Sequence, residues 1–445
     1  MSFPRYQKYK SSGVQWLGDI PEGWHTKRLR FVANLNPLKL EIADLDRRTN
    51  VSFLPMEAIG DDGRLSLDNE KTISDLESGY TYFRDGDVTI AKITPCYENG
   101  KGALMRDLKN GIGFGTTELI VVRPLPTKID SRYLNYLFIS PIFRDLGESH
   151  MYGAGGQKRV PDSFVKNLVI AVPSLAEQSA VAKFLDRETT KIDELVAEQQ
   201  RLMERLKEKR QAVISHAVTK GLNPHAPMKA SGIEWLGNVP EHWNAGRLRR
   251  FSRRYSGGTP DKTNLTYWQD GVIPWLNSGA VNDRLILEPS TFITPEAFAN
   301  SSAKWIPAGA LVMALAGQGK TKGMVAQLAI PSTCNQSMAA IVPSPNLDAR
   351  FLFWWLDSNY QSIRNLAGGD SRDGLNLELV GDIPMPVLPH PEQTAIAEFL
   401  DLETAKIDTL TAEAQSFIDL LQERRSALIS AAVTGQIDVH EVAGV

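Results

Sequence analysis

The sequence of 445 residues is poor in the features that several specialised protein classes require. Its only cysteines are Cys96 and Cys334, too few for a disulfide framework, and its seven histidines are scattered without the spacing of metal ligands. No apolar run is long enough to span a membrane, and residues 1–13 lack the apolar stretch of a signal peptide. We therefore expect a cytoplasmic protein with no structural metal and no membrane association.

The net charge of −3 shows no large excess of either sign, but the charges are distributed unevenly. The net charges of successive segments are +2 for residues 1–176, 0 for 177–219, +2 for 220–391 and −7 for 392–445. Three local clusters in the mildly basic segments, at residues 27–30, 157–159 and 247–254, contain lysine and arginine. Because phosphates attract such clusters, this distribution favours nucleic acid as a partner.

The sequence contains a long internal repeat. The segment SGVQWLGDIPEGWHTKRLRF (12–31) returns as SGIEWLGNVPEHWNAGRLRRF (231–251). The segment 177–219 returns as 392–434, with 25 of 43 aligned residues identical. The offset is 219 residues in the first pair and 215 in the second, so the chain is a tandem duplication. We therefore expect two domains built on a similar plan.

Residues 177–219 and 392–434 predict two long helices whose apolar residues recur at alternating steps of three and four. The predicted seam consists of Ile192, Leu195, Leu202, Leu206, Val213, Ile407, Leu410, Phe417, Leu421 and Leu428. One helix cannot bury such a seam alone, so we expect the two copies to pack on each other as a coiled coil. At 1.5 Å per residue, each helix would be roughly 60 Å long and would also act as a spacer.

The stretch ALAGQGKT (314–321) has the loose form of a phosphate-binding loop. Such a loop needs a buried strand before it and a helix after it, so that backbone N–H groups surround the phosphates. Residues 309–316 are a plausible strand, but Gly323, Pro331 and intervening β-branched residues predict a strand, a turn and a second strand. The counterpart in the first half, 94–102, has no phosphate-loop form. We interpret both segments as basic, glycine-containing turns suited to a polyanion, with an ATPase as the weaker alternative.

The order of variable domain, long helix, variable domain and long helix resembles the specificity subunit of type I restriction-modification systems. The motifs that carry the resemblance are Trp-Leu-Gly-x-x-Pro-x-x-Trp at the start of each half and Glu-Gln at the start of each helix. The resemblance covers residues 12–434 and implies an α+β fold with two tandem target recognition domains, curved sheets and an antiparallel coiled coil. The expected boundaries are 1–176 and 223–391 for the domains, 177–222 and 392–435 for the helices, and 436–445 for a tail.

The resemblance also implies a function. Each domain would read one half of a bipartite, asymmetric site in double-stranded DNA, and the helices would set the spacer between the halves. Two methyltransferase subunits would dock on this chain, and two motor-nuclease subunits would join them for cleavage. S-adenosylmethionine, ATP and magnesium would belong to those partners, so that this chain binds no cofactor and is not an enzyme by itself. The alternatives are a methylation-only system, a self-contained enzyme or a purely structural adaptor.

Reading DNA sequence requires side chains that can bond to base edges, carried on loops that a rigid framework places in the groove. The candidates are Lys92, Lys101, Gln157, Lys158 and Arg159 in the first domain, and Lys320, Lys322, Ser371, Arg372 and Asn376 in the second. The tryptophans of the repeated segment, Trp16, Trp24, Trp235 and Trp243, are interpreted as anchors of the domains, because both halves keep them.

Overall fold

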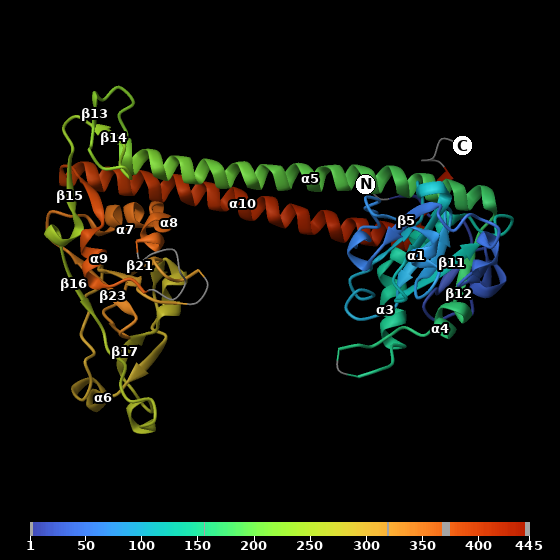
Figure 1. Cartoon of the computed structure of the whole chain (residues 1–445), viewed down its shortest axis with the longest axis horizontal. Helices are drawn as coiled ribbons and strands as arrows, with labels where there is room; N and C mark the ends of the chain where they lie inside the picture. The colour runs from blue at the N-terminus through green and yellow to red at the C-terminus, as the bar shows by residue number, and fades with distance from the viewer. Residues whose placement is uncertain (1–2, 155, 318–319, 367–373, 441–445) are drawn as a thin grey trace. The chain divides into compact units, whose positions relative to one another are not determined.

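The computed structural model describes residues 3–154, 156–317, 320–366 and 374–440. The chain forms two compact units, as the duplication predicts. The first unit comprises Met1–Gln199 with Gln415–Val445, and the second comprises Gln200–Ala414. Two long helices, α5 (Leu175–Lys220) and α10 (His390–Val433), lie side by side and each contributes to both units (Figure 1). Each helix is therefore shared between units, whereas the sequence-based boundaries treated it as a separate segment.

The first unit is a mixture of short strands and short helices. Its elements are β1 (Tyr9–Ser11), β2 (Asp19–Pro21), β3 (His25–Arg28), η1 (Leu29–Phe31), β4 (Ala33–Leu35), η2 (Lys39–Ile42), β5 (Asn50–Leu54), η3 (Met56–Ala58), β6 (Glu70–Thr72), α1 (Ile73–Leu76), β7 (Thr81–Arg84), β8 (Val88–Ala91), β9 (Gly102–Leu104), η4 (Lys109–Gly111), β10 (Ile112–Gly115), β11 (Leu119–Pro124), α2 (Ser131–Ile139), α3 (Pro141–Ser149), α4 (Asp162–Asn167) and β12 (Val169–Val172).

Two four-stranded sheets form the framework of the first unit. One has the order β4-β11-β8-β9 and is antiparallel. The other has the order β6-β5-β10-β7 and contains a parallel pair, β5 and β10. The central strands β8 and β11 are almost entirely buried, because most of their residues are apolar, and the buried Arg123 of β11 is paired with Asp87 at 2.7 Å. Helix α2 packs on this sheet and places Tyr133 and Leu134 in the core.

The second unit repeats this plan after α5. Its elements are β13 (Met228–Ala230), β14 (Asn238–Pro240), β15 (Asn244–Arg247), η5 (Leu248–Arg250), β16 (Ser252–Ser256), η6 (Leu265–Tyr267), β17 (Ile273–Leu276), η7 (Ser278–Asp283), β18 (Leu285–Ile286), β19 (Thr291–Ile293), α6 (Pro295–Ala299), β20 (Leu311–Ala314), β21 (Val325–Leu328), β22 (Thr333–Cys334), β23 (Met338–Pro343), α7 (Ala349–Ser358), α8 (Tyr360–Asn365), α9 (Leu377–Asp382) and β24 (Pro384–Val387).

The sheet order β16-β23-β20-β21 corresponds to β4-β11-β8-β9, with β18 added at one edge. The parallel pair β17 and β22 corresponds to β5 and β10. The two-stranded ribbons β1-β2 and β12-β3 return as β13-β14 and β15-β24. The topology is thus duplicated even between the repeated segments, where the two halves share little sequence. The expected mixed α/β fold with two domains is confirmed.

Within each unit, α5 and α10 run antiparallel. In the first unit, Arg425 Nε donates a hydrogen bond of 3.0 Å to Asp193 Oδ1. In the second unit, Arg210 Nε donates to Asp408 Oδ1, also at 3.0 Å. The two pairs are equivalent, because Asp193 corresponds to Asp408 and Arg210 to Arg425 at the offset of 215 residues. The same interhelical contact is therefore made twice.

The predicted seam was correct at alternate positions and wrong by one residue at the others. Ile192, Leu206, Ile407, Leu421 and Leu428 are buried and Val213 is half-buried. The remaining predicted seam residues, Leu195, Leu202, Leu410 and Phe417, are 41%, 42%, 49% and 44% exposed. The next residue in the chain is buried or half-buried in each case and occupies the seam instead: Val196, Met203, Thr411 and Ile418. Arg210 and Arg425 are half-buried at two further positions of the seam. Leucines that lie one residue before the seam positions keep the three-and-four spacing of a seam, so the sequence pattern predicted them. Arginine at a seam position is unexpected, so Arg210 and Arg425 did not reveal the correct register.

Candidate nucleic-acid interface

A tryptophan from each repeated segment fixes its domain to the start of a long helix. In the first unit, Trp24 Nε1 donates a hydrogen bond of 2.8 Å to Glu177 Oε1. In the second unit, Trp243 Nε1 donates one of 3.1 Å to Glu392 Oε1. Both rings are at most 1% exposed. The interpretation of these two tryptophans as domain anchors is confirmed.

The glutamine that follows each of these glutamates joins three chain segments. Gln178 Oε1 accepts from the Asp130 N–H at 2.7 Å, and its Nε2 donates to the carbonyls of Pro173 and Lys128. Gln393 Oε1 accepts from the Asp348 N–H at 2.8 Å, and its Nε2 also donates to two carbonyls. Both amides are buried and fully engaged, so the Glu-Gln pair at each helix start is a structural clamp.

A second anchor lies about two and a half turns further along each helix. In the first unit, Asp186 accepts a 2.7 Å hydrogen bond from Tyr136 Oη and pairs with Arg132 at 3.5 Å. Burial raises the pKa of Tyr136 above its usual range, so the phenol donates. The equivalent Asp401 accepts from Trp354 Nε1 at 2.9 Å and pairs with an arginine at 2.8 Å. Each recognition domain is thus held on the helix pair at two matched places.

The sequence-predicted loop residues of the first unit meet at one junction. After β8, the Lys92 N–H donates to the Glu118 carbonyl at 2.9 Å, and the Lys92 carbonyl accepts from the Val160 N–H at 2.8 Å. Two hydrogen bonds from the Arg159 guanidinium go to the Glu118 carboxylate, at 3.0 and 2.8 Å, and a third goes to the Gln157 carbonyl at 3.4 Å. The Arg159 guanidinium also holds the pKa of Glu118 below its usual range. Lys158 and Gln157 are exposed beside this junction.

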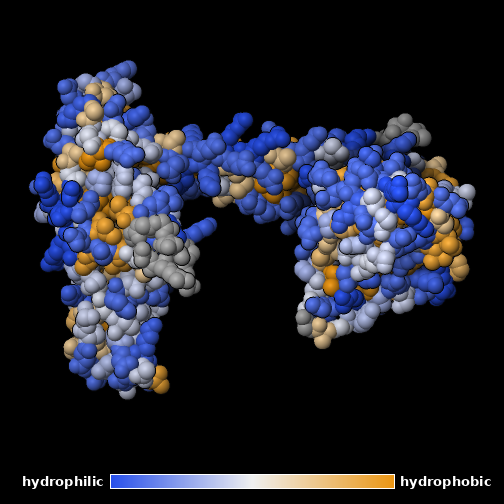
Figure 2. Space-filling model, viewed as in Figure 1, coloured by the Kyte–Doolittle hydropathy of each residue, from blue (hydrophilic) through white to orange (hydrophobic). Residues whose placement is uncertain are grey.

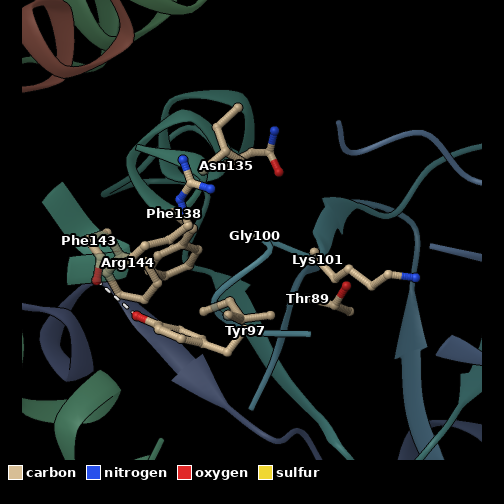
Figure 3. Close-up of a pocket in the computed structure, with 11 residues that line it drawn as sticks. Thr89, Tyr97, Gly100, Lys101, Asn135, Phe138, Phe143 and Arg144 are labelled. Carbon is tan, nitrogen blue, oxygen red and sulfur yellow. Dashed lines mark hydrogen bonds between the residues drawn. The ribbon is translucent and has the colours of Figure 1, made fainter. Parts of the chain in front are cut away.

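The basic turn after β8 is supported from beneath by a buried tyrosine. Tyr97 Oη donates to the Phe143 carbonyl at 2.8 Å, and its ring lies against α3 at the position of Gly147, where any side chain would clash with it (Figure 3). The adjoining pocket has a volume of about 10 Å³, enough for a single water molecule. Lys101 borders it and donates to the Met56 carbonyl at 2.9 Å. This pocket serves to position the turn and has no room for an organic ligand.

The second unit contains an equivalent junction. The Leu315 N–H donates to the Ser337 carbonyl, and the Leu315 carbonyl accepts from the Leu375 N–H, both at 2.8 Å. Leu315, Ser337 and Leu375 correspond in position to Lys92, Glu118 and Val160. The framework therefore brings two segments of unrelated sequence, which end at Val160 and at Leu375, to the same place on each domain.

The other candidates of the second unit are dispersed. Lys320 is exposed, and its carbonyl accepts from the Tyr360 hydroxyl. Lys322 is only 4% exposed, and Asn376 caps α9 by accepting from the Leu379 N–H. Ser371 and Arg372 lie outside the described residues, as do residues 318–319 of the phosphate-loop-like stretch. Within 320–328 the structure contains turns and then β21, so the helix that a phosphate loop requires is not formed there.

Sequence reasoning did not foresee the roles of the helix residues that hold the domains. Glu177, Gln178 and Asp186 are each identical in the second copy of the helix, and that repetition was the available signal. No helix among the described residues is long and apolar enough to cross a membrane. In that same part of the chain, no cluster of three or more His, Cys, Asp or Glu is arranged to hold a metal ion.

Two copies of one domain, each held at the start of a long helix by the same clamp, define a duplicated two-domain protein. The sequence model of the type I restriction modification DNA specificity domain matches residues 21–204 and again residues 240–416. These matches cover more than half of the chain and fall once in each half. The chain belongs to this family.

Individual relatives agree with this membership. The EcoAI specificity subunit of Escherichia coli is 45% identical over 165 residues, which cover 37% of this chain and 27% of that protein. The EcoR124I/EcoR124II specificity subunit of the same organism is 28% identical over 258 residues, which cover 57% of each protein. The chain therefore matches less than two thirds of the length of these relatives.

Solved structures show the same fold. A chain from a study of the complex assembly and conformational transition of the type I R-M system has a TM-score of 0.75 at 18% identity, covering 93% of this chain and 98% of its own length. The HsdS subunit from Thermoanaerobacter tengcongensis has a TM-score of 0.59 at 18% identity, covering 94% and 98%.

Proposed function

We propose that the chain is the DNA-recognition subunit of a type I restriction-modification complex and performs no chemistry by itself. The observation that carries this proposal is the family match in each half of the chain. Each unit would read one half of a bipartite, asymmetric site in double-stranded DNA. Because the loops at the two junctions differ in sequence, the two half-sites would also differ. A subunit that reads DNA would act in the cytoplasm.

Exposed side chains at the loop junctions are the best candidates for DNA contact. Gln157 can bond to an adenine edge, and Lys158 or Lys320 to a guanine edge or a phosphate. If Lys158 contacts a phosphate, Lys158→Ala should weaken binding to all sequences and lower the slope of log affinity against log salt by about one. Lys229→Ala, at another exposed lysine, is the matched control and should leave the slope unchanged. An unchanged slope for Lys158→Ala would remove Lys158 from the interface.

The remaining candidates have competing roles. Arg159 is engaged with Glu118, Lys101 with a backbone carbonyl, and Asn376 with the start of α9. Lys92 is half-buried and Lys322 is buried, so each would need a rearrangement to reach DNA. Ser371 and Arg372 stay candidates on the sequence alone.

Exchange of a single domain tests the modular reading. Replacing residues 1–176 with the corresponding domain of a relative should change one half-site and leave the other half-site and the spacer intact. Sequencing of methylated sites in cells that carry the matching methyltransferase would measure this. A simultaneous change in both half-sites would contradict independent reading by the two units.

Partner docking is supported by an apolar surface on the long helices. Leu195 and Phe417 are exposed in the first unit, and Leu410 and Leu202 are their counterparts in the second. Figure 2 shows hydrophobic residues on the surface of the paired helices. Two methyltransferase subunits would cover these equivalent sites, and two motor-nuclease subunits would join them. S-adenosylmethionine, ATP and magnesium would bind to those partners.

We also propose that the helices determine the spacer between the half-sites. Inserting four residues after Ala197 keeps the apolar seam roughly in register and adds about 6 Å. The spacer should then lengthen by about one or two base pairs. A two-residue insertion is the control, because it misaligns the seam and should weaken folding or assembly. An active four-residue insertion variant with an unchanged spacer would contradict the proposal.

The alternatives have separate tests. The chain mixed with its methyltransferase should bind DNA without ATP, and Lys320→Ala should leave nucleotide affinity unchanged, because none is expected. Saturable ATP binding that disappears in Lys320→Ala would favour the ATPase alternative. A methylation-only system would give the same DNA binding with no nuclease activity in the complete complex.

A further inference from the structure

Phe184 and Phe399 are equivalent residues of the duplicated helices, but their surroundings differ. Phe184 on α5 is 1% exposed, whereas Phe399 on α10 is 37% exposed. The two residues are related by the offset of 215, and the neighbouring Leu185 and Leu400 are both fully buried. The difference therefore arises from what covers the phenylalanine, and not from a rotation of the helix.

In the first unit, an aromatic residue near the chain start covers Phe184. The Phe3 ring lies edge-on to the Phe184 ring, with centroids 5.1 Å apart. The Arg187 guanidinium lies 5.8 Å from the Phe184 centroid. The segment containing Phe3 is held by the chain end, because the Pro4 carbonyl accepts a 2.8 Å hydrogen bond from the Asp438 N–H. Two chain ends thus meet over this phenylalanine.

In the second unit, the corresponding place is a groove with a volume of about 340 Å³, lined by Ala212, Val213, His216, Ala217, Gly221, Leu222 and Phe399. Here the chain continues from α5 through Leu222 into the second domain. One continuous segment therefore lies where the segments around Phe3 and Asp438 meet in the first unit. Leu222, the counterpart of Phe3 at the offset of 219 residues, lines this groove but stays 41% exposed and leaves Phe399 37% exposed. The duplication therefore leaves one copy of the aromatic site only partly filled.

The rim of the groove differs in charge from its counterpart. Glu398 stands where the first unit has Lys183, and the exposed Leu402 stands where it has Arg187. One acidic and one apolar residue thus replace two basic residues, so this part of the rim is less basic than its counterpart. In the first unit the covering segment is Phe3-Pro4-Arg5, an aromatic residue followed by a basic one. Glu398 would attract a basic residue beside the hydrophobic anchor of an incoming segment.

We infer that this groove receives a segment of a methyltransferase subunit, presenting a hydrophobic anchor residue beside a basic residue. The inference rests on the proposed function, which supplies the partner, and it goes further by making the two docking positions unequal. The methyltransferase at the second unit gains an anchor in the groove. The methyltransferase at the first unit gains none, because Phe3 already occupies the equivalent site.

The test compares Phe399→Ser with Phe292→Ser in the full chain, purified with its methyltransferase. Phe292 is 44% exposed on β19 of the same unit and lines neither the groove nor the helix pair, so it is a matched control. Native mass spectrometry during dilution would follow complexes with one and two methyltransferases. Phe399→Ser should weaken binding of one methyltransferase by about tenfold or more, while the other methyltransferase and Phe292→Ser behave as wild type. Helical circular dichroism would verify folding.

A crosslinking arm identifies the occupant. A photoreactive phenylalanine placed at Leu402 should form an adduct with the methyltransferase in the assembled complex. Adducts only between two copies of this chain, or an unaltered second binding step in Phe399→Ser, would overturn the inference and leave the proposed function standing. If the wild-type chain bound no methyltransferase at all, the proposed function and the inference would both fail.

Discussion

The two units hold their domains with the same residues but fill the adjoining space differently. In the first unit, Asn135 and Ile139 of α2 border a polar cleft of about 680 Å³ beside the helices. In the second unit, their counterparts are Phe353 and Asp357, and Asp357 accepts a 2.7 Å hydrogen bond from Arg284. Duplication has therefore kept the anchors, while the material packed around them has diverged.

The packed arrangement of the second unit is a stack of cations on aromatic rings. The guanidinium carbons of Arg284 and Arg350 lie 5.1 Å from the Trp354 centroid, and that of Arg210 lies 5.8 Å away. Burial lowers the pKa of Arg284. Its interaction with the rings is correspondingly stronger than at an exposed site. The comparison indicates that the second domain is held more firmly than the first.

The largest effect is expected from the ring at the centre of that stack. Trp354→Ala should lower the free energy of unfolding of the second unit by about 3–5 kcal/mol, because it leaves a cavity and removes the ring beside Arg210 and one of the two rings beside Arg284 and Arg350. Tyr136→Ala in the first unit should cost less, since a cleft already adjoins Tyr136. Hydrogen exchange resolved by unit would measure both. Equal losses would contradict the difference in packing.

Replacing the clamp glutamines should reduce the stability of the two units by equal amounts. Gln178→Ala and Gln393→Ala should each cost about 1–3 kcal/mol in unfolding free energy, because each strands a buried N–H group and two carbonyls. The exposed Gln200 on α5 is the control, and its replacement by alanine should change stability by less than about 0.5 kcal/mol. Urea unfolding followed separately in each unit would reveal any asymmetry.

The reciprocal arginines of the seam should contribute less. The Arg210–Asp408 and Arg425–Asp193 pairs should each contribute about 0.2–1 kcal/mol, because the aspartate partners are more than half exposed. Arg210→Ala should cost more than Arg425→Ala, because Arg210 also lies against the Trp354 ring. A double-mutant cycle with Asp408 or Asp193 would isolate each pair. Exchanging the charges, as in Arg210→Asp with Asp408→Arg, should recover part of the loss. Markedly different coupling energies would show that the two ion pairs are not equivalent.

The smallest effect concerns pH and belongs to the first unit alone. The pKa of Glu118 is lowered by Arg159, so the contribution of this pair is fully present above the ordinary carboxyl value and is lost as pH falls through the folded-state pKa. Glu118→Gln should therefore reduce exchange protection of residues 152–160 at neutral pH to the level that wild type shows in acid. Residues 374–376 should show no such step, because Ser337 replaces the carboxylate. A step of equal size there would exclude Glu118 as its cause.

The sequence predicted the parts of the fold that the duplication preserves. Two similar helical segments, with 25 of 43 residues identical, indicated the domain plan, and the repeated Trp24 and Trp243 were identified as anchors. The predicted seam residues were wrong at alternate positions. Leu195 and Leu202 have the spacing of seam residues although they are exposed, and Arg210 is a seam residue although it is charged. The clamp role of Gln178 could not be predicted, since the backbone groups that it joins are distant in the sequence. The loop residues stay predictions, because local sequence does not determine which side chains, such as Arg159, are already engaged by a neighbour such as Glu118.

The reciprocal Asp193–Arg425 and Arg210–Asp408 pairs also constrain how such chains can be recombined. Each pair has one residue in α5 and one in α10. A substitution of the α5 residue therefore requires a compensating substitution in α10 if the ion pair is to be kept. At the first junction, by contrast, Arg159 pairs with Glu118 of the same half. Genetic exchange can therefore replace a loop or a whole domain, provided that the incoming helix carries its aspartate and arginine at the same positions.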